Sequence, residues 1–152
     1  MFEFIESISI DTVAGSARGR ASVSAKQPLL TDHFPGNPLL PGSWLIELVA
    51  QIAGPLAEEL VRQNFNLDRW ALMGMIRDAK FLRPVSWPAT INLFARAERV
   101  ETSSVAVNVS AEVDDQLVMR AELVMMMAEA APEWHQAIRA REARLARWKG
   151  TE

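Results

Sequence analysis

The sequence predicts an α+β domain in which an antiparallel sheet wraps around one long buried helix. Three observations favour this fold class. Several segments alternate apolar and polar residues, short turns separate those segments, and residues 42–54 are apolar on every side of a helical period. Alternation with short turns is typical of antiparallel strands, and a helix that is apolar all round is a buried helix.

Strands are expected on both sides of that helix. They are residues 2–10, 18–25, 71–85, 89–98, 104–113 and 116–127. Turn residues at 11–15 predict that the first two strands form a hairpin. A proline-rich loop at 27–41 leads into the helix, which the Gly54-Pro55 pair is expected to kink or end. Residues 56–63 are expected to add another helical piece.

The C-terminal residues differ in character from the rest of the chain. Trp134, Ile138, Leu145 and Trp148 recur near helical spacing with arginines between them, which predicts an amphipathic helix packed on the body or on a second subunit. A membrane-surface or carrier-docking role is the alternative. We therefore expect two parts, residues 1–131 as the folded domain and residues 132–152 as a helical tail.

Composition excludes several functional classes. The formal net charge is −3 for 152 residues, which argues against binding nucleic acid by neutralising phosphates. There is no cysteine and only two histidines, so thiol catalysis is excluded and neither a metal nor another cofactor is expected. No stretch is apolar enough for stable membrane insertion, and the acidic N-terminal residues do not resemble a secretory signal. The expected location is cytoplasmic.

Residues 33–51 hold the groups that could carry chemistry. His33 lies in the loop and could act as a base, although a single loop histidine is more often structural. Glu47 and Gln51 are the strongly polar members of the helix and share one face. Glu47 is therefore expected to be a buried carboxylate, and burial disfavours its charged form, so that it can keep a proton and act as a general acid. The backbone N–H groups at the helix start could stabilise a negative oxygen. A purely structural role for the same segment fits these residues equally well.

Two motifs resemble the 3-hydroxyacyl-(acyl carrier protein) dehydratases of the hotdog superfamily. The first is His33-Phe34-Pro35-Gly36-x-Pro38-x-x-Pro41-Gly42 followed by Glu47-x-x-Ala50-Gln51-x-x-Gly54, and the second is Lys80-Phe81-x-Arg83-Pro84-Val85. The resemblance implies a dimeric hotdog fold with His33 and Glu47 as catalytic residues. It also implies that the Gly42 N–H polarises the thioester carbonyl and that Gln51 bonds near the catalytic acid. In that family the histidine and the acid come from opposite subunits.

The resemblance implies a lyase of fatty acid or related polyene lipid biosynthesis that converts carrier-linked 3-hydroxyacyl thioesters to trans-2-enoyl thioesters. Its partners would be acyl carrier protein and a second hotdog subunit, in a homodimer or a heterodimer. Asp32 before the histidine and Ser86-Trp87-Pro88-Ala89 after the second motif depart from the family pattern, so we expect a divergent member. A hotdog acyl thioesterase and a non-catalytic hotdog subunit supporting an active partner are the alternatives.

Overall fold

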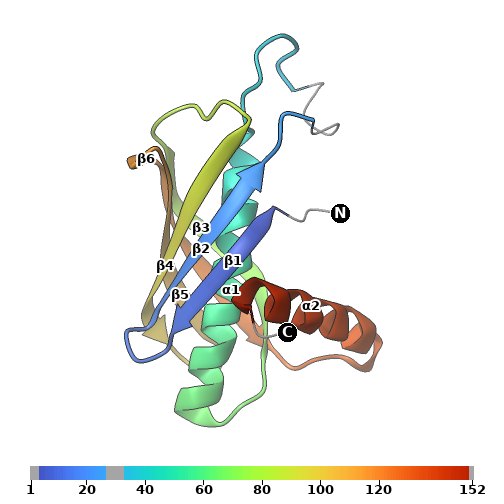
Figure 1. Cartoon of the computed structure of the whole chain (residues 1–152). Coiled ribbons are helices and arrows are strands. Elements are labelled where there is room, and N and C mark those ends of the chain that lie inside the picture. The colour runs from blue at the N-terminus through green and yellow to red at the C-terminus, as the bar shows by residue number, and fades with distance from the viewer. Residues whose placement is uncertain (1–3, 27–32, 151–152) are drawn as a thin grey trace.

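A six-stranded antiparallel sheet curves around one long helix in the computed structural model, which describes residues 4–26 and 33–150 (Figure 1). The strands are β1 (Ile5–Asp11), β2 (Ser16–Val23), β3 (Trp70–Phe81), β4 (Ala89–Val100), β5 (Ser104–Val113) and β6 (Gln116–Ala128). The helices are α1 (Gly42–Phe65), the short 3-10 helix η2 (Pro132–Trp134) and α2 (His135–Lys149). The predicted α+β class is therefore confirmed.

Some predicted features lie outside the described residues. These are the first residues of the expected strand at 2–10, residues 27–32 of the loop, which include Asp32, and the last two residues of the tail. Within the described residues, no helix is long and apolar enough to cross a bilayer.

The sheet has the strand order β1-β2-β4-β5-β6-β3. Residues that face α1 align across neighbouring strands, for example Leu93 with Ala111 and Ala111 with Met119. All three are fully buried, because alternate residues of each strand point to the helix side. The period-two pattern of the sequence therefore places one continuous apolar layer under α1.

Helix α1 crosses that layer as a single element. It does not end at Pro55, contrary to one of the two outcomes expected there. Pro55 has no N–H to donate to the Gln51 carbonyl, but Leu56 and Ala57 beyond it are fully buried, and this packing holds the second half in line. The close approach depends on Gly19 of β2, where a Cβ would lie 2.8 Å from a methyl group of Ile52.

Strand β3 forms an open edge of the sheet. It pairs with β6 on one side and with no other strand among the described residues. Its apolar side chains Leu72, Met73, Met75 and Ile76 are 40–48% exposed. A long, apolar, unpaired edge is a surface that proteins usually cover.

The C-terminal helix α2 packs back onto the body of the protein. It contacts β1, and its half-buried Leu145 and Trp148 touch the core. Two of its side chains form ion pairs with the second half of α1, Arg141 with Glu58 and Lys149 with Glu59. In Figure 1, the C-terminal end of α2 lies near the middle of α1 and the rest of α2 extends towards the lower right.

Candidate active site

One face of α1 carries a polar pair beside the open edge of the sheet. Gln51 Nε2 donates a hydrogen bond to Glu47 Oε1 over 2.9 Å. The pair forms because residues four apart lie one above the other on a helix. The other amide atom, Gln51 Oε1, is buried and has no hydrogen-bond partner among the described residues. A buried acceptor without a partner indicates a place where a donor belongs.

Glu47 and Gln51 stand in a groove of about 390 Å³ between α1 and β3. Most of its lining is apolar or small. The lining residues are Ser43, Ile46, Glu47, Ala50, Gln51, Gly54, Trp70, Ala71, Met73, Ile76, Met125 and Arg141. An apolar groove with a few convergent polar groups is the usual form of a small-molecule site.

Gly42 begins α1 in an adjoining groove that also includes Phe81 and Arg83. Its N–H has no acceptor among the described residues, as expected for the first turn of a helix. A Cβ on Gly42 would lie 2.9 Å from the Phe81 ring, so only glycine lets that ring reach the helix start. The two motifs that the sequence singled out therefore meet here.

His33 lies apart from the polar pair in the single chain. It is half-buried in the loop before α1, and its ring contacts that of Phe34 edge-on at 4.6 Å. It lines neither the groove of Glu47 nor that of Gly42. The structure thus brings Glu47 and Gln51 together and places Gly42 at the head of the same helix, but His33 stands outside this cluster.

The expectation that Glu47 is a buried carboxylate is wrong for the single chain. Its side chain is exposed, because it faces the open groove at the β3 edge and not the buried apolar layer between α1 and the sheet. The buried carboxylate of α1 is Glu58, which is 9% exposed. Glu58 was not predicted from the sequence, since an acidic residue next to Glu59 in the second half of a helix gives no sign of burial.

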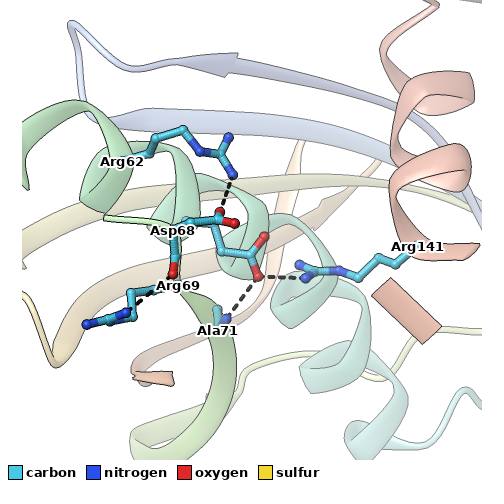
Figure 2. A network of polar contacts seen from close by, with 6 residues as sticks. Arg62, Asp68, Arg69, Ala71 and Arg141 are labelled. Atoms are coloured by element: carbon cyan, nitrogen blue, oxygen red, sulfur yellow. Dashed lines mark hydrogen bonds and ion pairs between the residues drawn. The ribbon is translucent and has the colours of Figure 1, made fainter. Parts of the chain in front are cut away.

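Glu58 is held by donors from two distant elements. Arg141 Nη1 of α2 donates to Glu58 Oε1 over 2.6 Å, and the Ala71 N–H of β3 donates to the same oxygen over 2.9 Å (Figure 2). The Arg141 guanidinium also lies over the Trp70 ring at 4.3 Å. Burial raises the pKa of Glu58 above its ordinary value of 4.5, although the Arg141 charge and both hydrogen bonds oppose that rise.

The architecture is that of a hotdog domain, as solved structures of similar fold show. A protein from Streptococcus mutans, solved bound to acetyl CoA, aligns with a TM-score of 0.66 and 16% identity, covering 84% of this chain and 91% of that one. A thioesterase from Haemophilus influenzae aligns with a TM-score of 0.59 and 14% identity, covering 79% and 76%. At this level of identity the likeness concerns the fold alone.

Sequence comparison narrows the class to one family. The chain belongs to the family of FabA-like domains, which it matches over residues 1–122. It is 33% identical over 122 residues to the 3-hydroxyacyl-(acyl carrier protein) dehydratase FabZ of Chlamydia pneumoniae, covering 80% of this chain and 79% of the relative. The FabZ of Chloroflexus aggregans is 34% identical over 113 residues, covering 74% and 76%. The chain is a divergent FabZ-like member, and α2 follows the matched residues.

Proposed function

We propose that this protein is a hydro-lyase that dehydrates 3-hydroxyacyl thioesters carried by acyl carrier protein, in fatty acid biosynthesis. The observation that carries the proposal is the Glu47–Gln51 pair at the head of an apolar groove, with a buried amide oxygen that lacks a donor. A 3-hydroxyacyl chain fits this groove, because its apolar tail matches the walls and its hydroxyl can lie beside the exposed Glu47 carboxyl.

Three groups act in the elimination of water: a base, an acid and a donor to the thioester oxygen. A base removes the proton from C2, the electron pair forms the C2–C3 double bond, and the C3–O bond breaks as the hydroxyl takes a proton and leaves as water. We assign His33 as the base and Glu47 as the acid. Because Gln51 Nε2 donates to Glu47 Oε1, the acidic proton belongs on Oε2. A positioned acid or base typically contributes about 10²–10⁴-fold.

Negative charge develops on the thioester oxygen when C2 loses its proton. The Gly42 N–H, at the positive end of α1, is the group assigned to stabilise that oxygen. The flat ring of Phe81 against Gly42 leaves no room for a side chain there. Loss of one such donor typically costs about 3–4 kcal/mol of transition-state stabilisation.

A second subunit completes the proposed site. His33 lies outside the groove of Glu47 within one chain, whereas the exposed apolar edge of β3 borders that groove. A second copy, or a related hotdog subunit, that pairs with this edge would cover the groove and bring its own histidine to it. Covering the groove would also remove water from around Glu47, which disfavours the charged carboxylate and so keeps a proton on the group assigned as the acid.

The proposed carrier partner approaches from the side of Gly42. Arg83 is exposed in the groove that Gly42 begins, and it offers a positive charge to an acidic carrier protein. Lys80 is paired with Asp78 over 3.3 Å, so it contributes less free charge. The proposed location is the cytoplasm.

One assay separates the candidate functions. The purified protein is incubated with a 3-hydroxyacyl carrier protein, and the products are analysed by mass spectrometry. A product lighter by one water supports dehydration, a free acid supports the thioesterase alternative, and unchanged substrate supports a non-catalytic subunit. His33→Ala should lower dehydration by about 10²–10⁴-fold with the circular dichroism spectrum unchanged. Near-full turnover of His33→Ala would refute the assignment of the base.

A further inference from the structure

The groove beside Glu47 has an end wall. Along α1 it passes Glu47 and Gln51 and reaches Gly54. A Cβ at Gly54 would lie 3.1 Å from Arg141 Nη2, 3.7 Å from the Ala71 Cβ and 3.8 Å from the Met125 Cε. Side chains from α2, β3 and β6 therefore converge on this point. Gly54 lies seven positions after Glu47, which corresponds to about 10 Å along the helix.

Arg141 is the part of this wall that comes from the C-terminal helix, and its guanidinium is fixed on three sides. One nitrogen donates to Glu58 Oε1 at 2.6 Å, the plane lies over the Trp70 ring at 4.3 Å, and Nη2 rests on Gly54. Figure 2 shows Arg141 reaching from α2 towards the carboxylate that also accepts the Ala71 N–H. A guanidinium that is paired and stacked in this way resists displacement.

The end wall depends on a segment beyond the family match. The FabA-like domain covers residues 1–122, whereas Arg141 belongs to α2. A second ion pair, between Lys149 and Glu59, fastens α2 to the same helix further along. Helix α2 thus adds the Arg141 guanidinium to the groove, and this group lies outside the residues that match the family.

We propose that Arg141 limits the length of the acyl chain that this enzyme accepts, with short and medium chains as its substrate class. The inference rests on the proposed function, because it takes the occupant of the groove to be the acyl chain of the substrate. A chain that extends past Gly54 has to move the guanidinium off Trp70 and away from Glu58, which leaves a buried carboxylate without its partner. Chains that end before Gly54 do not disturb it.

Two substitutions move the wall in opposite directions. Arg141→Ala removes the guanidinium and deepens the groove. Gly54→Ala adds a methyl group against Arg141 Nη2 and makes the groove shallower, and alanine is favoured in a helix interior, so this variant keeps the fold. Lys149→Ala is the matched control, because it loosens α2 from Glu59 without touching the groove.

The first readout is kcat/KM for 3-hydroxyacyl carrier substrates of increasing chain length. We expect the ratio of long-chain to short-chain kcat/KM to rise at least about 10-fold in Arg141→Ala and to fall by a similar factor in Gly54→Ala, since one methylene in a pocket is worth about 10–200-fold. Lys149→Ala should leave the ratio unchanged. Length profiles of Arg141→Ala and Gly54→Ala that run parallel to the wild-type profile would overturn the proposal. If Arg141→Ala does not fold, the long-chain to short-chain ratio of kcat/KM in Gly54→Ala alone tests the proposal.

The second readout does not need catalysis. Saturated acyl-pantetheine thioesters of graded length, which lack the 3-hydroxyl, are titrated into the protein by calorimetry. Affinity should rise with length up to a limit, and that limit should move to longer chains in Arg141→Ala. If the length limit shifts in Arg141→Ala but the wild-type protein dehydrates no substrate, the proposed function is refuted, while Arg141 still limits the length of the bound chain. If the wild-type protein dehydrates its substrate but the length limit does not shift in Arg141→Ala, only the role of Arg141 as a length limit is refuted.

Discussion

Replacement of Arg141 by methionine should make the stability of the protein depend on pH in a new way. Burial already raises the pKa of Glu58, and the charge and the hydrogen bond of Arg141 restrain that rise. Arg141→Met removes both and leaves a carboxylate that is buried with one remaining donor, the Ala71 N–H. The pKa of Glu58 should therefore rise further in the variant.

The sign and the size of the effect follow from proton linkage. A carboxyl whose pKa is raised in the folded state adds fully to the free energy of unfolding below about pH 4.5. That stabilisation is lost as pH rises through the pKa of the folded state. Because pH 7 is about 2.5 pH units above the ordinary value, the loss at pH 7 cannot exceed about 3.4 kcal/mol at 1.36 kcal/mol per unit. The wild-type protein already loses part of this free energy of unfolding at pH 7, because burial raises the pKa of Glu58, and the variant should lose more. The lost contact with Trp70 adds about 0.5–2 kcal/mol at every pH.

The assay is urea unfolding of wild type and Arg141→Met from pH 4.5 to pH 8 at one protein concentration. The difference in the free energy of unfolding should be about 0.5–2 kcal/mol at pH 4.5, from the lost Trp70 contact, and should grow by a further amount of about 1–3 kcal/mol towards pH 7. Lys149→Met, which breaks the neighbouring pair with Glu59, serves as the control. A difference between wild type and Arg141→Met that stays constant over the whole range would show that Arg141 does not control the protonation of Glu58.

Three further predictions concern other parts of the molecule. Gln51→Leu removes the donor to Glu47 and should lower kcat about 10²-fold through misplacement of the acid, measured by steady-state kinetics; an unchanged kcat would show that the pair has no role. Gly19→Ala should cost about 1–3 kcal/mol of unfolding free energy through overpacking against Ile52, so an unchanged urea midpoint would contradict it. Leu72→Asp places a charge on the exposed β3 edge and should shift sedimentation from dimer to monomer with loss of activity, whereas a fully active monomer would contradict a shared site.

The strands and the first helix could be predicted because their patterns are local. Alternation along 104–113 matches β5 residue for residue, and the apolar stretch from Gly42 matches the first half of α1. The strand expected at 71–85 ends earlier, at Phe81. The N–H groups of Leu82 and Arg83 both donate to the Val118 carbonyl of β6, whereas the Val85 carbonyl accepts from the Leu40 N–H. Such a contact between distant segments leaves no local signal in the sequence.

One contact of the candidate site was predictable from the sequence, and its surroundings were not. The spacing of Glu47 and Gln51 indicates a shared helix face, and the structure joins them by a hydrogen bond. Exposure of Glu47 was not predictable, because an apolar helix pattern does not distinguish burial by its own sheet from burial by a second subunit. Glu58 and Arg141 are 83 residues apart, and only the folded chain shows that they meet.

In the proposed dimer, one subunit supplies His33 and the other supplies Glu47 to each site. The test is to mix His33→Ala protein with Glu47→Gln protein, unfold the mixture together and refold it. Each variant alone should be inactive. The mixture should recover about a quarter of wild-type activity, because half of the dimers are mixed and each mixed dimer holds one intact site of two. A refolded mixture that contains mixed dimers and remains inactive would contradict the shared site.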